Sequence, residues 1–63
     1  MLLWVLEYDL GETKLYLCPD NKYSQHLKDA LKFESEQSAL QYLQINTVLF
    51  TFKAVPYSFE FAD

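Results

Sequence analysis

The chain has 63 residues, with nine acidic residues against five lysines, no arginine and a formal net charge of -4. A chain this short builds one hydrophobic core, which predicts a single domain over residues 1–63. Direct binding to nucleic acid is disfavoured, because phosphate contacts need clustered positive charge and base readout relies on arginine. The longest apolar run, Met1–Leu6, is far below the roughly 20 residues of a membrane-spanning helix, so we expect no membrane span.

Aromatic side chains make up 17% of the chain. Each ring buries on the order of 150 to 250 Å², and a core of this size has few interior places for so many of them. We therefore expect some rings at the surface, where apolar patches often mark contact with a second copy or another protein. Cys18 is the only cysteine, which excludes an internal disulfide and is typical of a reducing compartment. A cytoplasmic protein is expected.

The first half of the chain predicts a β-hairpin. Leu2–Asp9 is rich in strand-forming residues and places alternate side chains on one face. Gly11, the only glycine, follows it and can adopt the positive φ that hairpin turns often need. Thr13–Cys18 alternates again, and Pro19–Asn21 ends the pattern. We expect the two strands to pair directly and antiparallel.

Two helical segments are predicted next. Apolar residues within Tyr23–Phe33 recur at helical spacing, which predicts a short helix of one or two turns. Ser35 is the predicted N-cap of the main helix, which runs to about Gln44. Asn46 can take the left-handed conformation that often closes a helix.

The remaining residues predict strands. Thr47–Val55 is a β-branched and aromatic run, typical of a third strand. Pro56 lacks a backbone donor, so it should interrupt that strand or lie on a free edge. Tyr57, Phe59 and Phe61 alternate with smaller or polar residues, which predicts a further short strand at an edge. The predicted fold class is α+β: a small antiparallel sheet, made of a hairpin and one or two returning strands, covered by one main helix.

Two consecutive segments carry a resemblance to a known class of proteins. Lys28–Ser35 (KDALKFES) and Glu36–Leu43 (EQSALQYL), placed after a predicted hairpin, resemble a recurrent pattern of small phage and prophage accessory proteins. The shared pattern is an alanine and an aromatic residue ahead of a capped helix, and the resemblance covers most of the chain. It implies a fold of hairpin, helix and returning strand. Such proteins include inhibitors of bacterial defence nucleases, the anti-CRISPR class, some of which are acidic mimics of DNA. A phage-encoded protein of this kind would act in the host cytoplasm.

No combination of residues predicts catalysis, a cofactor or a metal site. A cysteine nucleophile needs a base and an orienting group, and a metal site needs three or four ligands. His26 is the only histidine available to Cys18. We expect Cys18 to be an ordinary, partly buried thiol and His26 to be solvated. A hydrolase with paired carboxylates is disfavoured too, because a small sheet under one helix offers little concavity.

Acidic and aromatic side chains are the candidate contacts for a partner protein. The acidic residues either solubilise the domain or form a contact surface that imitates phosphate spacing. The rings of the C-terminal segment follow Pro56 and are expected at an interface, whereas Trp4, Phe50 and Phe52 are expected in the core. The predicted protein-binding residues are Glu7, Asp9, Glu12, Glu34, Glu36, Tyr57, Phe59 and Phe61.

The sequence therefore favours a non-enzymatic protein-interaction module, of the phage-inhibitor type, that binds a host protein with a basic surface. The alternative is a structural or assembly protein that forms a homo-oligomer through its C-terminal edge strand.

Overall fold

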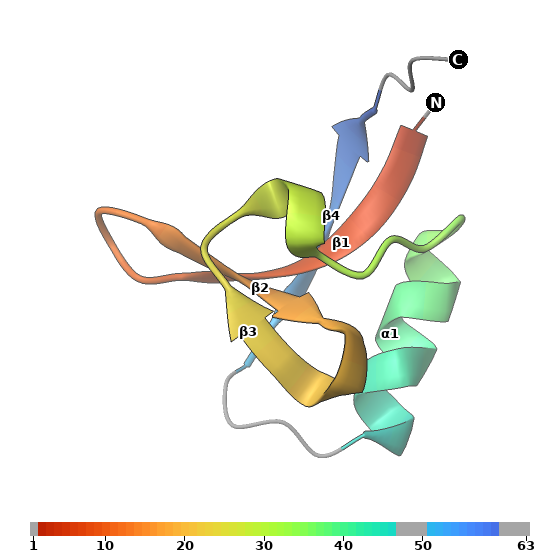
Figure 1. Cartoon of the computed structure of the whole chain (residues 1–63). Helices are drawn as coiled ribbons and strands as arrows, with labels where there is room; N and C mark the ends of the chain where they lie inside the picture. The colour runs from red at the N-terminus through yellow and green to blue at the C-terminus, as the bar shows by residue number, and fades with distance from the viewer. Residues whose placement is uncertain (1, 47–50, 60–63) are drawn as a thin grey trace.

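The computed structural model describes residues 2–46 and 51–59. Four strands in this part of the chain form one antiparallel sheet in the order β3-β2-β1-β4, and one α-helix packs against it (Figure 1). The predicted α+β class is confirmed. The elements are β1 (Leu2–Asp9), β2 (Lys14–Cys18), β3 (Lys22–Ser24), α1 (Glu36–Ile45) and β4 (Lys53–Ser58), with 3-10 turns at Pro19–Asn21 and Leu27–Asp29.

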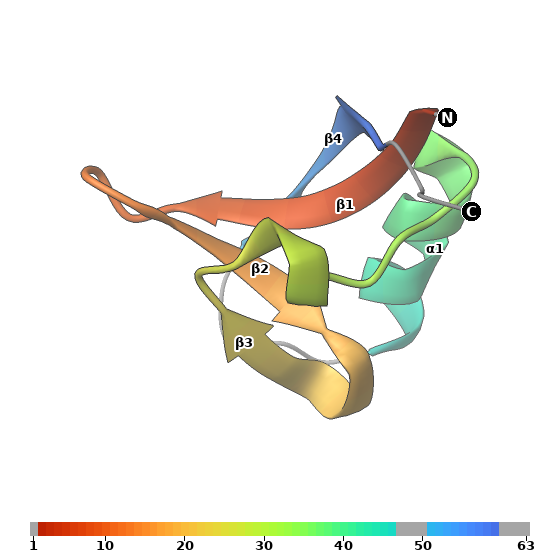
Figure 2. The ribbon, with the colours of Figure 1, turned by 45° about the horizontal axis from the view of Figure 1, so that its top comes forward.

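The central strand β1 is buried on both of its faces. Its consecutive residues Val5 and Leu6 point to opposite sides of the sheet, and both side chains are fully buried. Leu6 belongs to a core cluster with Leu17, Ala39 of α1 and Phe52, whereas Val5 packs with Tyr16 and Ala30. The Leu27–Asp29 turn lies in front of the sheet and α1 lies beside it (Figures 1 and 2). Each face of β1 therefore has its own cover.

The predicted hairpin of β1 and β2 is confirmed. β1 pairs with β2 only near the turn, at Glu7, Tyr8 and Asp9. Towards the start of β1 the segment 31–33 lies between the two strands. Leu31 donates its N–H to the Leu17 carbonyl at 2.9 Å. Trp4 and Phe33 exchange two backbone hydrogen bonds of 2.8 Å.

Of the one or two helical turns predicted within Tyr23–Phe33, a single 3-10 turn is present, and the rest of the prediction is wrong. Residues 22–24 join the sheet as β3, the three residues Leu27–Asp29 form a single 3-10 turn, and residues 31–33 are hydrogen-bonded to strands. The chain reverses before β3 because Asp20 and Asn21 adopt positive φ, which these two residue types tolerate. Backbone pairing with β2 and β1 therefore overrides the helical spacing of the apolar residues.

The main helix begins at the predicted cap and ends at Ile45, close to the predicted Gln44, but the conformation of Asn46 differs from the expected one. The Ser35 hydroxyl oxygen accepts the Ser38 N–H at 3.1 Å, which confirms the N-cap. Asn46 is not left-handed, with φ of -106° and ψ of 130°. Both its backbone N–H and its side-chain amide donate to the Tyr42 carbonyl at 3.0 Å. These bonds satisfy a terminal carbonyl without a left-handed residue.

The last described strand continues through the proline. Of the predicted third strand Thr47–Val55, residues 47–50 lie outside the described residues, and β4 begins at Lys53. Tyr57 and Ser58 belong to β4, so the predicted separate strand at the C-terminal segment is instead a continuation of it. Pro56 lies inside β4, which is an edge strand of the described sheet, in agreement with the predicted edge position.

Leu17→Ala tests the core that α1 covers. Leu17 is fully buried, so we expect the substitution to lower the free energy of unfolding by about 2 to 5 kcal/mol. Leu10→Ala is the matched control, because Leu10 is 45% exposed and its truncation should change stability little. Urea unfolding followed by circular dichroism measures both effects. Similar losses for the two variants would contradict the assigned core.

Candidate interaction surface

The turn between β1 and β2 projects beyond the rest of the sheet (Figures 1 and 2). The pairing of β1 with β4 stops at Glu7 and Lys53, so the end of the hairpin has only its own two strands. The turn is nevertheless held by local hydrogen bonds. The Asp9 carboxylate accepts the Gly11 N–H at 2.7 Å, and Leu10 donates its N–H to the Thr13 carbonyl at 2.9 Å.

The tip of this turn combines apolar and acidic side chains. Leu10 is one of the large apolar side chains that are exposed in the described structure, and it lies between the exposed residues Asp9 and Glu12. Gly11 has a φ of +99°, which explains why the one glycine of the chain occupies this position. Leu10 is not among the residues that the sequence predicts to bind a partner. The sequence does mark this residue, because Leu10 is an apolar residue within the predicted turn and lies outside the alternating pattern of either strand.

Glu7 lies behind the tip and is not a free surface charge. Its side chain is only 12% exposed, and Lys14 Nζ lies 3.4 Å from its Oε1. The Tyr57 hydroxyl donates a hydrogen bond to Glu7 Oε2. This bond to the carboxylate, together with burial, raises the pKa of the Tyr57 hydroxyl above its ordinary value. Through these two contacts Glu7 of β1 links Lys14 of β2 to Tyr57 of β4, on the face of the sheet that carries Val5.

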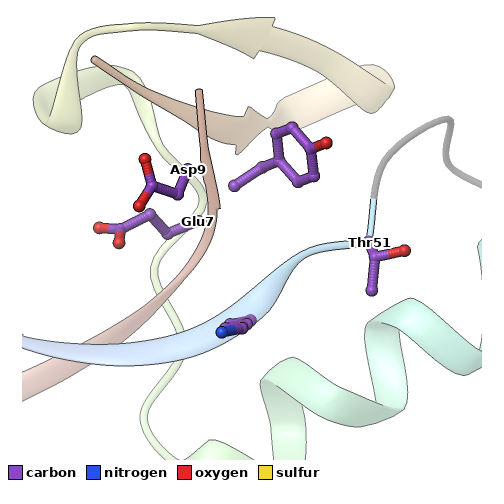
Figure 3. Close-up of a pocket in the computed structure, with 5 residues that line it drawn as sticks. Glu7, Asp9 and Thr51 are labelled. Carbon is purple, nitrogen blue, oxygen red and sulfur yellow. The ribbon is translucent and has the colours of Figure 1, made fainter. Parts of the chain in front are cut away.

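A hollow of about 310 Å³ adjoins this carboxylate (Figure 3). The Glu7 and Asp9 side chains point to the same side of β1, as the two-residue period of a strand requires. Lys53 is the cross-strand neighbour of Glu7, so the hollow has charges of both signs on its wall. Its lining residues are Glu7, Tyr8, Asp9, Thr51 and Lys53.

The acidic candidate residues form two separate groups. Asp9 and Glu12 lie at the projecting turn, with Glu7 behind them. Glu34 and Glu36 are exposed at the start of α1, on the opposite side of the molecule (Figures 1 and 2). A single small contact cannot include both groups. All five lysines lie among the described residues, and two of them, Lys14 and Lys53, are close to Glu7.

The candidate rings Tyr57 and Phe59 pack on the face of the sheet that carries Val5 and Glu7. The Tyr57 ring centroid lies 6.4 Å from that of Tyr16 and 6.5 Å from that of Phe59. Lys32 Nζ lies 5.3 Å from the Phe59 centroid, which is within the range of a cation–π contact. Tyr57 and Phe59 are half-buried. Their contact with a partner stays a prediction, and Phe61 lies outside the described residues.

The rings expected in the core are found partly there. Phe52 is buried in the cluster that α1 covers, as predicted, and its ring stacks on Tyr23 with centroids 5.9 Å apart. Trp4 is half-buried and packs against the same cluster. Phe50 lies outside the described residues.

The remaining polar candidates are Cys18 and His26. Cys18 is buried, and both burial and the nearby Asp29 carboxylate raise the pKa of its thiol. His26 is exposed, as expected. Within residues 2–46 and 51–59 there is no group of three or more His, Cys, Asp or Glu side chains that could hold a metal ion.

The helix of the described chain is too short to cross a membrane. Comparisons of the chain with protein-family models, curated proteins and solved structures found no match.

The outer edge of β4 presents an incomplete row of donors. Trp4 directs both its N–H and its carbonyl to Phe33, so it offers neither to its β4 neighbour Pro56. Pro56 therefore directs its backbone nitrogen away from β1, as do Ala54 and Ser58 by the period of the strand. The position between these two donors has no N–H. Such a proline is one way in which proteins discourage pairing at a free edge.

Tyr57→Phe tests the hydrogen bond to Glu7. Since the pKa of Tyr57 is raised in the folded protein above its ordinary value of 10.0, the unfolded chain releases this proton first as pH rises. The hydroxyl therefore contributes stability below about pH 10 and loses that contribution at higher pH. We expect the gap in unfolding free energy between wild type and Tyr57→Phe to shrink from about pH 8 to pH 11. A gap that stays constant in urea unfolding experiments would be the contrary result.

Pro56→Thr tests whether the proline limits pairing at the outer edge of β4. Threonine restores an outward N–H between those of Ala54 and Ser58 and favours a strand, so we expect concentration-dependent self-association to increase. Sedimentation velocity of the wild type and the variant measures it. Lys53→Thr is the control, because it adds the same residue to β4 without adding a donor. If Pro56→Thr associates no more than this control, the proline does not protect the edge.

Proposed function

We propose that the chain is a non-enzymatic protein-interaction module that binds a basic surface of a partner protein through its β1–β2 turn. The observation that supports this best is the exposed Leu10 at the tip of a projecting turn, flanked by Asp9 and Glu12. An apolar side chain between carboxylates suits an apolar depression with a basic rim. The apolar group contributes burial, and the carboxylates contribute steering and orientation.

The turn is suited to this role because it is already ordered. The hydrogen bonds of Asp9 to Gly11 and of Leu10 to Thr13 hold its backbone, so binding would cost little loop entropy. The adjoining hollow adds a second point of contact. A lysine or arginine side chain of the partner could enter it beside Asp9 and meet the Glu7 and Asp9 carboxylates.

We further propose that the partner is a host protein that handles nucleic acid. The net charge of -4, the absence of arginine and the resemblance to small phage accessory proteins support an inhibitor that competes with nucleic acid for a basic surface. Lysines lie close to Glu7 on the described surface, so contact through one projecting element fits better than a continuous imitation of a phosphate array.

The alternative function is assembly into a homo-oligomer through the C-terminal edge strand. One observation favours it, which is that β4 lies at an edge of the described sheet. Pro56 opposes it by removing the central outward donor. Assembly through β4 requires the wild-type protein to associate, so a wild type that stays monomeric in sedimentation experiments would exclude this alternative.

Charge reversal at the turn tests the proposed contact. Proteins captured from bacterial lysate on the immobilised chain would first be identified, and each purified partner then titrated with wild type and with Asp9→Lys/Glu12→Lys. We expect the double variant to bind at least about tenfold more weakly, and the wild-type affinity to fall as salt is raised. Leu10→Ser, which keeps both charges, should weaken binding with little change in salt dependence.

Glu34→Lys/Glu36→Lys is the matched comparison, since it makes the same change in net charge on the opposite side of the molecule. Circular dichroism would confirm that each variant is folded. Under the proposal this variant retains binding apart from a small general electrostatic loss. Loss of binding here, with full affinity for Asp9→Lys/Glu12→Lys, would assign the contact to the start of α1 instead.

A further inference from the structure

The outer surface of α1 has almost no ionisable groups. After Glu36 the helix contains none except the hydroxyl of Tyr42. Its exposed face carries Gln37, Gln41 and Gln44, flanked by Leu40 at 43% exposure and Ile45 at 81%. The outer face of a solvated helix normally carries charged side chains, whereas protein interfaces are depleted in lysine and glutamate. This face shares with interfaces the depletion of charged side chains.

We propose that this face binds a second copy of the chain, with the two α1 helices antiparallel about a two-fold axis near Leu40 and Gln41. Charge restricts where two copies of the chain can meet. Two chains of net charge -4 repel each other over most of their surfaces, and the outer face of α1 is an extended neutral region where they can approach. A strongly basic partner would gain nothing from a face without carboxylates.

The glutamine stripe is complementary to itself. Each amide both donates and accepts hydrogen bonds, so a glutamine can pair with a glutamine. Gln37 and Gln44 lie four residues before and three residues after Gln41, which makes the stripe nearly symmetric. An antiparallel two-fold arrangement therefore places Gln37 opposite Gln44 of the second copy and Gln41 opposite its own equivalent. Leu40, adjacent to the axis, then contacts the Leu40 of the second copy.

The contact is small, because α1 has only ten residues and offers one face. Small interfaces are typical of weak and transient association. The expected behaviour is a reversible dimer whose fraction rises with protein concentration. The contact leaves the β1–β2 turn uncovered, so this inference stands independently of the proposed function.

Sedimentation equilibrium of the full chain over a range of concentrations up to about 1 mM tests the proposal. Gln41→Glu is nearly isosteric, keeps a good helix former and places two like charges next to each other at the two-fold axis. We expect it to weaken association at least about tenfold. Gln25→Glu is the matched control, since Gln25 is exposed and lies outside α1. It adds the same charge and should leave association nearly unchanged.

Mixing complementary variants gives a readout that a mere loss of folding could not imitate. Gln41→Glu and Gln41→Lys should each be monomeric alone and should associate when mixed, because opposite charges then meet at the axis. A wild-type chain that stays monomeric up to about 1 mM would overturn the proposal. Equal association of the wild type, Gln41→Glu and Gln25→Glu would also overturn it, since the contact would then lie elsewhere.

Discussion

Burial of β1 on both faces is the constraint on which the rest of this structure depends. Val5 and Leu6 are adjacent and fully buried, so each side of the strand must be covered by a different part of the chain. The helix α1 covers the Leu6 side. The segment that contains Ala30 covers the Val5 side, together with Tyr57 and Phe59. A strand of this kind reads as a continuous apolar run, which is how β1 begins.

The position of residues 31–33 links this core to the projecting turn. These residues hydrogen-bond to both Leu17 and Trp4, so they occupy the space where β1 and β2 would otherwise continue their pairing. On the other side of β1, pairing with β4 ends at Glu7. In the described sheet the last two residues of β1 therefore pair with β2 alone, and the turn after them extends from the sheet. The shape of the candidate contact follows from where the neighbouring strands stop.

The molecule has two surfaces of different character. The β1–β2 turn is acidic with one exposed leucine, and α1 presents glutamine, leucine and isoleucine. A basic partner is attracted by carboxylates, whereas a second copy of this acidic chain is repelled by them. Two separate surfaces therefore give each proposed contact the electrostatic conditions that it needs. Glu7 lies behind the turn and lines the adjoining hollow. Its carboxylate bonds with Tyr57 and Lys14 hold it against the sheet, and its contact with a partner stays a prediction.

Local signals in the sequence were sufficient for the parts of the fold that local chemistry decides. The β1–β2 hairpin with Gly11 at its turn follows from alternation and backbone freedom, and the start of α1 follows from Ser35 as a cap. Tertiary contacts decided the rest. β3 and the extended segment 31–33 exist because partner strands satisfy their backbone groups, and this pairing outweighs the weak helical period of the same residues. Likewise, only the fold shows that Glu7 is enclosed while Leu10 is exposed, because burial depends on neighbours that are distant in the sequence.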